Sequence, residues 1–140
     1  VAKLTSAHGE YNDRFGNSVA ISDGTIVVGV RYDDDKGQSS GSAYVFEKRS
    51  SDGVSSWMQV AKLTAADGAN WHLFGESVAI SDGTIVVGVD YDDEKGHMAG
   101  AAYIFRITPD EKKKLCSQDV PHWTNSRSTS KISRNKLAPC

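Results

Sequence analysis

The stretch SVAISDGTIVVGV occupies residues 18–30 and returns without a change at residues 77–89. Around it, residues 1–46 align with residues 60–105 at a spacing of 59, and 31 of the 46 aligned positions are identical. A repeat of this kind indicates a chain built from copies of one supersecondary unit, each of which buries an apolar face against its neighbour. The unit therefore has to be understood before the whole chain.

The repeated stretch has the periodicity of two strands joined by a tight turn. SVAIS alternates, with Val19 and Ile21 on one face, whereas TIVVGV is a continuous β-branched run typical of a strand buried on both faces. Between them lies Asp-Gly, which favours an antiparallel hairpin because glycine tolerates a positive φ. The stretch predicts a β-hairpin in each unit.

Two more strands follow in the first unit. SAYVF alternates again, with Tyr44 and Phe46 on one face, and WMQVAKLT at 57–64 makes a fourth strand. Residues 1–105 contain no sustained apolar period of 3.6 residues, so we expect no helix there.

Four short antiparallel strands with two apolar faces form a sheet that must stack on a neighbouring sheet to be stable, as the blades of a propeller do. The sequence therefore predicts an all-β fold of two partial four-stranded antiparallel propeller blades, at about residues 17–64 and 76–105. VAKLT at residues 1–5 is expected to be the outer strand of a preceding unit, and the last strand of the second blade is expected to be missing. Phe15 and Phe74, each followed by glycine, are interpreted as wedges between blades.

Charge divides the chain into two parts. Residues 1–105 hold 8 Lys and Arg against 15 Asp and Glu, whereas residues 106–140 hold 8 against 3, so the overall charge of −2 hides an acidic repeat and a basic tail. The tail is rich in Ser, Lys and Arg, and we expect it to be irregular and disordered. Its Cys116 and Cys140 either pair or stay free thiols. No feature points to nucleic acid, and no apolar run approaches the roughly 20 residues of a transmembrane segment.

An acidic run follows the second strand of each unit, as YDDDKG at 32–37 and YDDEKG at 91–96. One interpretation is a calcium ion held by side-chain oxygens; the candidate ligands are Asp33, Asp35, Asp92 and Glu94. The other is that aspartates bond local backbone groups and fix the turn before the glycine. Recurrence in both units supports either interpretation.

The two units differ most in SAHGEYNDR at 6–14 and AADGANWHL at 65–73, and again in QSSGS against HMAGA. These polar or small stretches between apolar runs are predicted to be loops. We expect the first pair to form a ligand-contacting face, because the scaffold around it is nearly constant. The candidate contact residues are Glu10, Tyr11, Asp13, Asn70, Trp71 and His72.

The ordered motifs of each unit resemble those of a known family. FG followed by SVAIS, then IVVGV, then GSAYVF or GAAYIF, is similar to the FG-GAP repeats found in the β-propeller of integrin α subunits and in many secreted or surface proteins. The resemblance covers residues 1–105 and implies blades of a commonly seven-bladed propeller that binds ligands at the cell surface or outside the cell.

This chain departs from the family pattern in two places. Integrin-type calcium sites use a long Asp-rich loop between the first and second strands, where this chain has only SDGT, so the family's calcium ligands cannot be carried over. In addition, Gly-Val replaces Gly-Ala-Pro at 29–30 and 88–89, which removes a proline from the turn.

Sequence and resemblance together predict a non-catalytic extracellular or cell-surface recognition or adhesion module, integrin-like and a fragment of a larger β-propeller. Its expected partners are a protein or glycan ligand at the loop face and neighbouring propeller blades. Two alternatives stay open: a fragment of a calcium-dependent propeller hydrolase or lyase, and a truncated gene product without independent function. The chain has no nucleophile-elbow, P-loop or dinucleotide-binding motif.

Overall fold

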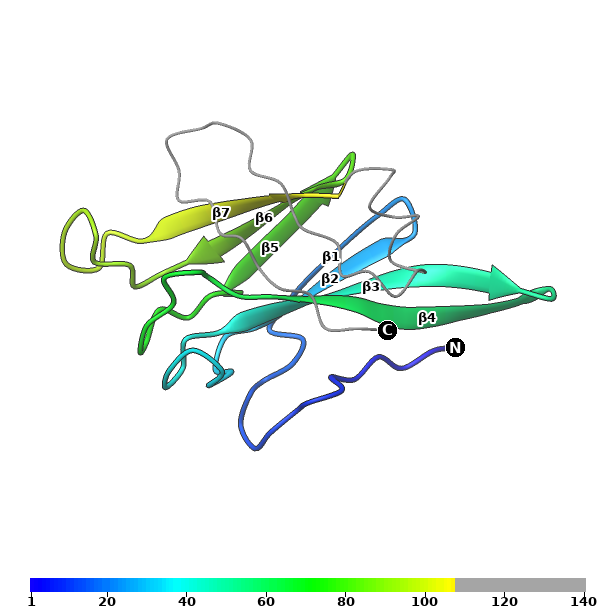
Figure 1. Cartoon of the computed structure of the whole chain (residues 1–140), viewed down its shortest axis with the longest axis horizontal. Coiled ribbons are helices and arrows are strands. Elements are labelled where there is room, and N and C mark those ends of the chain that lie inside the picture. Colours follow the sequence, from blue (N-terminus) through cyan, green and yellow to red (C-terminus); the bar gives the residue numbers. More distant parts are fainter. Residues whose placement is uncertain (108–140) are drawn as a thin grey trace.

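The computed structural model describes residues 1–107, which form two antiparallel β-sheets and, within that range, no helix (Figure 1). The four-stranded first sheet consists of β1 (Ser18–Ser22), β2 (Thr25–Val30), β3 (Ser42–Ser51) and β4 (Val54–Leu63). The three-stranded second sheet consists of β5 (Ser77–Ser81), β6 (Thr84–Val89) and β7 (Ala101–Arg106). In both sheets the spatial order follows the chain. The predicted all-β fold of one four-stranded and one incomplete blade is confirmed. The predictions for the tail beyond Ile107, including Cys116 and Cys140, lie outside the described residues.

The hairpins turn on Asp-Gly pairs whose two residues both have positive φ. The angles are 47° and 73° at Asp23-Gly24, and 46° and 72° at Asp82-Gly83. Two consecutive positive φ values define the type I′ turn, whose twist matches that of the flanking strands. The sequence predicted both turns. A third, Asp52-Gly53 with 50° and 78°, joins β3 to β4 in the same way.

The two sheets pack face to face. We call the face of each sheet that carries its buried tyrosine, Tyr44 or Tyr103, the front face, and the opposite one the back face. The back face of the first sheet packs against the front face of the second in one apolar cluster. The first sheet contributes Val27, Ala43, Val45, Val60, Ala61 and Leu63, and the second contributes Ile85, Val87, Val89, Tyr103 and Phe105.

Phe74 lies in this cluster and is fully buried. Its ring meets Tyr103 and Phe105 edge-on at 5.5 and 6.0 Å, while its backbone N–H donates to the Ser40 carbonyl at 2.9 Å. Backbones come close beside it, since a Cβ added to Gly29 would lie 2.1 Å from the Gly75 carbonyl oxygen. The wedge interpretation is confirmed for Phe74.

The first five residues correct one prediction. Residues 1–5 were expected to form an outer strand, but they form no strand. A strand there needs a third strand of a preceding unit to pair with, and the described residues provide none. Leu4 instead packs, together with Phe15 and Trp57, against the front face of the first sheet.

The repeated TIVVGV also behaves differently in its two copies. Val27 and Val28 of β2 are both buried, as predicted for a strand covered on both faces. The prediction is wrong for β6, where Val87 is buried but Val86 is 36% exposed. Within the described chain, no sheet covers the back face of the second sheet, so only one face of β6 is buried.

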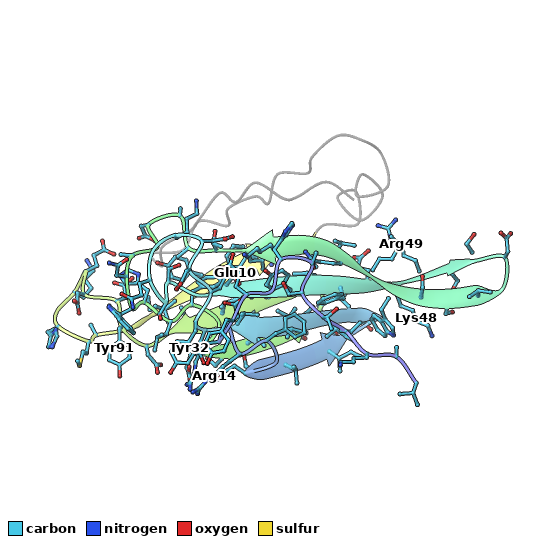
Figure 2. All side chains as sticks on the ribbon, turned by 90° about the horizontal axis from the view of Figure 1, so that it is seen from below. Glu10, Arg14, Tyr32, Lys48, Arg49 and Tyr91 are labelled. Atoms are coloured by element: carbon cyan, nitrogen blue, oxygen red, sulfur yellow. The ribbon has the colours of Figure 1, made fainter. Side chains whose placement is uncertain are left out.

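The loops that differ between units gather at one end of the molecule. Figure 2 shows Glu10, Arg14, Tyr32 and Tyr91 at this end, while Lys48 lies toward the far hairpin of β3 and β4. The antiparallel order explains why the loops gather there. The Asp-Gly turns that join β1 to β2, β3 to β4 and β5 to β6 lie at one end of the sheets, so the remaining connections lie at the other. We call this the loop end; it holds every residue that the sequence proposed as a site.

Candidate functional site: the loop end

The acidic run of the first unit is a hydrogen-bonded turn. The carboxylate of Asp33, which is buried, accepts from the Asp35 N–H at 3.1 Å and from the Ser42 hydroxyl at 2.9 Å. The carboxylate of Asp34 accepts from the Ser39 N–H at 2.6 Å. These are the local side-chain to backbone bonds by which aspartate fixes turns.

The second unit repeats this turn with the same geometry. Asp92 is also buried, and its carboxylate accepts from the Glu94 N–H at 3.0 Å. Asp93 accepts from the Met98 N–H at 2.7 Å. The acidic runs therefore shape the loops in both units, whatever else they bind.

In the first unit a lysine lies against two of the proposed metal ligands. The Lys62 ammonium is 2.7 Å from the Asp33 carboxylate and also contacts Asp35. It lies 5.2 Å from the centre of the Tyr44 ring. Burial by itself would lower the pKa of Lys62, but its hydrogen bonds to Asp33, Asp35 and Tyr44 outweigh burial and raise that pKa. Asp33 and Asp35 thus already hold a cation of the protein.

Among residues 1–107 no group of three or more His, Cys, Asp or Glu side chains is arranged to hold a metal ion. In the second unit Asp92 is buried and Glu94 is exposed. Calcium binding by Asp33, Asp35, Asp92 and Glu94 stays a prediction.

Calcium binding by Asp92 and Glu94 predicts a rise in melting temperature on calcium titration, because a ligand of the folded state stabilises it, by about 2.7 kcal/mol at 100 times Kd. Glu94→Gln should abolish the rise. Asp35→Asn should leave it, since the Asp35 carboxylate contacts Lys62. A melting temperature that calcium does not change in the unmodified chain would contradict a calcium site in either unit.

The two loops that differ most in sequence share one backbone conformation. Asn12 and Trp71, at equivalent positions, have φ of 73° and 66°, and the equivalent Arg14 and Leu73 have φ of 56° and 57°. Positive φ is uncommon for residues other than glycine, asparagine and aspartate, and is unfavourable for bulky side chains. The repeat therefore presents different side chains on the same frame.

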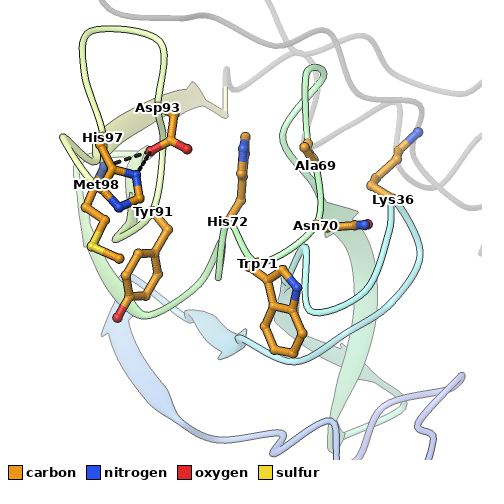
Figure 3. A pocket seen from close by; sticks show the side chains of 10 residues that line it. Lys36, Ala69, Asn70, Trp71, His72, Tyr91, Asp93, His97 and Met98 are labelled. Atoms are coloured by element: carbon orange, nitrogen blue, oxygen red, sulfur yellow. Dashed lines mark hydrogen bonds and ion pairs between the residues drawn. The ribbon is translucent and has the colours of Figure 1, made fainter.

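In the second unit this loop and the loop after β6 form a pocket (Figure 3). Figure 3 shows the Tyr91 and Trp71 rings pointing to one side and the His72 ring pointing to the other, with Asp93, His97 and Met98 near Tyr91. Its lining residues are Lys36, Gly68, Ala69, Asn70, Trp71, His72, Tyr91, Asp93, His97 and Met98. We call it the aromatic pocket.

Hydrogen bonds hold the backbone of the loop that carries Trp71 in the aromatic pocket. The Asn70 side chain accepts from the Gln38 N–H at 2.9 Å, and the Trp71 N–H donates to the Gln38 carbonyl at 2.7 Å, so the loop is anchored to the first unit. The Trp71 side chain is 52% exposed. The Nδ1 atom of His72 is buried and has no hydrogen-bond partner among the described residues. An anchored backbone with an exposed indole is suited to contact a ligand.

The first unit has a pocket in the equivalent place with a different chemistry. It is lined by His8, Glu10, Asp13, Asp33, Asp34 and Asp35. Asp13 is buried and its carboxylate accepts from the Glu10 N–H at 2.7 Å, which is a structural role. Tyr11 is fully exposed and lines neither pocket.

The structure thus brings Asn70, Trp71 and His72 together in the aromatic pocket, and Glu10 and Asp13 together with Asp33 and Asp35 in the acidic one. Neither pocket is lined by residues of both variable loops.

Comparison with known proteins agrees with this arrangement of units. A family model described as FG-GAP repeat matches residues 1–46 and 57–105. The chain belongs to the FG-GAP repeat family. No curated protein and no solved structure matches it.

The Phe-Gly pair of the FG-GAP repeat has a clear structural role in this chain. Gly16 and Gly75 have φ of 92° and 94°, which a residue with a side chain rarely adopts. A Cβ on Gly75 would lie 2.3 Å from the Ser42 carbonyl oxygen, so this glycine also allows the two sheets to approach.

Within residues 1–107 of this FG-GAP chain, no helix meets the length and hydropathy needed to cross a bilayer.

Sequence reasoning missed half of the aromatic pocket in this FG-GAP protein. Lys36, Tyr91, Asp93, His97 and Met98 line it and were not proposed as contact residues. One signal was available, since HMAGA against QSSGS is the second place where the units differ. It was interpreted only as a loop, because nothing in the sequence shows that this loop lies beside residues 69–72.

Proposed function

We propose that this FG-GAP chain is a non-catalytic recognition module that binds a protein or glycan ligand at the aromatic pocket. The observation that carries the proposal is Trp71, a bulky exposed side chain held at positive φ where the other unit has asparagine. Strained backbone of this kind is found at ligand-contacting sites more often than elsewhere.

The lining of the aromatic pocket supports a ligand with both apolar and polar surface. Trp71, Tyr91 and Met98 offer exposed apolar area, while Asn70, Asp93 and His97 offer hydrogen-bonding groups around it. Tryptophan and tyrosine carry much of the affinity at protein interfaces, and their rings also stack on sugars. A peptide loop or an oligosaccharide fits this chemistry.

The family supports the setting of the proposal. FG-GAP repeats form propeller-type modules, and the family is generally extracellular. We therefore propose an extracellular or cell-surface location and an integrin-like adhesive role for the protein that carries these units. The buried carboxylates of Asp33 and Asp92 are engaged by turn bonds, which supports recognition rather than catalysis.

Replacing Trp71 with asparagine, the residue of the other unit, is expected to weaken binding strongly without harming the fold. Asparagine tolerates positive φ, so the backbone should be kept or relaxed. Loss of a central tryptophan typically costs about 2 kcal/mol or more, or roughly 30-fold in Kd. The measurement is binding to an oligosaccharide array and to a displayed peptide library, with melting temperature as the check on folding.

Tyr11→Asn is the matched control, because Tyr11 is exposed in the equivalent loop and lines neither the aromatic pocket nor the acidic one. It should leave binding unchanged. Retention of every bound oligosaccharide and peptide by Trp71→Asn would refute the proposal, and so would an unmodified chain that binds none of them.

A further inference from the structure

In the described part of the chain, the outer edge of β7 lacks the partner strand that the equivalent edge of β3 has in the first sheet. In the first sheet β3 is flanked by β2 and β4, but in the second sheet β7 is flanked only by β6. Such an edge presents unpaired N–H and C=O groups that can pair with another strand. The strand that would fill it by analogy is a copy of β4.

Residues 1–5 are that copy in sequence. They read VAKLT, the same as residues 60–64, of which all but Thr64 lie in β4. They form no strand where they are. The chain therefore contains both a segment with the sequence of β4 and, in β7, the equivalent of the β3 edge that β4 pairs with.

The register of the first sheet fixes how the two would meet. Opposite Ala43, Tyr44 and Val45 of β3 lie Leu63, Lys62 and Ala61 of β4. Moving each by the repeat length places Leu4, Lys3 and Ala2 opposite Ala102, Tyr103 and Ile104. The three side chains of the added strand are then identical to those of β4. The three facing residues of β7 match those of β3 except that Ile104 stands where β3 has Val45.

The side-chain contacts of Lys62 and Leu63 could be repeated by Lys3 and Leu4. In the first unit Lys62 crosses the Tyr44 ring to reach the buried Asp33 carboxylate. Tyr103 and Asp92 keep these places in the second unit, and the Tyr103 hydroxyl lies 3.4 Å from the Asp92 carboxylate. Lys3 in the new strand would repeat the lysine contact. Leu4 would occupy the position of Leu63, which is fully buried.

The exposed sheet faces are complementary as well. Val19 and Ile21, each 66% exposed, lie on the front face of the first sheet, and Val86 is exposed on the back face of the second. Within one chain these two kinds of face already pack together, where Val78 and Ile80 join the cluster around Val27. A second copy placed one repeat further along would cover both exposed faces in the same manner.

From this agreement of edge, register and faces, we propose that two copies of the chain join head to tail. Residues 1–5 of one copy form the fourth strand of the second sheet of the other, and the front face of its first sheet covers the back face of that second sheet. The contact is heterologous and therefore repeats along a row of copies or closes a ring.

Polar groups at the new contact are compatible with it. The Ser18 hydroxyl donates to the Gly75 carbonyl at 2.8 Å within one chain, and between copies Ser77 and Gly16 would take these places. The Arg31–Glu76 pair, at 2.9 Å, would be replaced by Asp90 and Asn17, so no like charges meet at this point.

The first test is the mass of the 140-residue chain in solution. Sedimentation at increasing protein concentration should show species of two or more chains, and Leu4→Asp should return the mass to that of one chain. Val54→Asp is the control, since it puts the same charge on a side chain that is 70% exposed beside the far turn between β3 and β4, away from residues 1–5 and from the edge of β7, and it should leave association unchanged. Circular dichroism checks that both variants keep their sheets.

A disulfide test fixes the geometry, using chains with Cys116→Ser and Cys140→Ser. A chain carrying Ala2→Cys, mixed with a chain carrying Ile104→Cys, should cross-link to a covalent dimer much faster than the same chain mixed with one carrying Ala79→Cys. A chain of single mass at every concentration would overturn the proposal. Association in which the two mixtures cross-link at equal rates would overturn it too, because the copies would then meet by another surface.

Discussion

Replacing Phe74 with alanine is expected to lower the free energy of unfolding by about 3–5 kcal/mol, the range for a buried phenylalanine. The ring is fully buried between the two sheets and packs edge-on against Tyr103 and Phe105. Alanine would leave a cavity whose walls belong to two sheets, and both have paired strands that cannot move in to fill it. Urea unfolding of the unmodified and variant chains measures the difference.

Phe15→Ala is the matched control, because Phe15 holds the same place in the first unit. It makes the same edge-on contacts, with Tyr44 at 5.7 Å and Phe46 at 6.1 Å, but it is only half-buried, and no second sheet among residues 1–107 covers it. The loss should be less than half that of Phe74→Ala. Equal losses would show that Phe74 does not act as a wedge between sheets.

Asp33→Ala is expected to destabilise the chain by a similar amount, about 3–5 kcal/mol, the range for breaking one side of a buried ion pair. The Asp33 carboxylate is buried and accepts hydrogen bonds from the Asp35 N–H and the Ser42 hydroxyl besides pairing with Lys62. Its removal leaves the Lys62 ammonium with only the largely exposed Asp35 carboxylate as a charged partner among residues 1–107, and it removes the two hydrogen bonds that fix the turn. Thermal and urea unfolding at neutral pH measure the loss.

Lys62→Met separates the ion pair from the turn, because it removes the ammonium and keeps the bonds from Asp35 and Ser42 to Asp33. It should cost less than Asp33→Ala. The raised pKa of Lys62 sets the pH dependence: the pair's contribution is complete below the ordinary lysine value of 10.5 and is lost only as the pH rises through the higher folded value. The difference in free energy of unfolding between the unmodified chain and Lys62→Met should therefore be constant from neutral pH to about pH 9. A difference that already falls between pH 7 and 9 would contradict the ion pair.

Local patterns predicted the strands, because a strand and its hairpin turn depend mainly on neighbours in the sequence. Alternation in SVAIS, the β-branched run of TIVVGV and the Asp-Gly pair between them each specify backbone conformation within a few residues. The same reasoning predicted the turn role of the acidic runs, since Asp33 and Asp92 bond backbone groups two residues away. Residues 1–5 show the limit, because VAKLT forms a strand only where another strand is available.

The candidate site was predicted only in part, for the same reason. Trp71 stands out in sequence as a large residue in a loop that differs between units, but its neighbours in the aromatic pocket come from residues about 20 positions further on. The antiparallel path of β5 and β6 brings Tyr91 and Met98 back to the loop end. Lys62 was missed as the partner of Asp33 because β4 lies opposite β3 only after the sheet has formed.

The thirteen residues SVAISDGTIVVGV separate what the sequence determines from what the tertiary structure determines, because they occur twice without a change. By itself the sequence determined two strands, an Asp-Gly turn with φ near 47° and 72°, and an antiparallel pairing that is the same in both copies. Tertiary structure alone decided burial. Val27 is fully buried because the second sheet packs on it, while the equivalent Val86 is 36% exposed. Hydrogen bonding along a hairpin is local, but burial depends on what packs against the sheet, which no stretch of sequence can specify for itself.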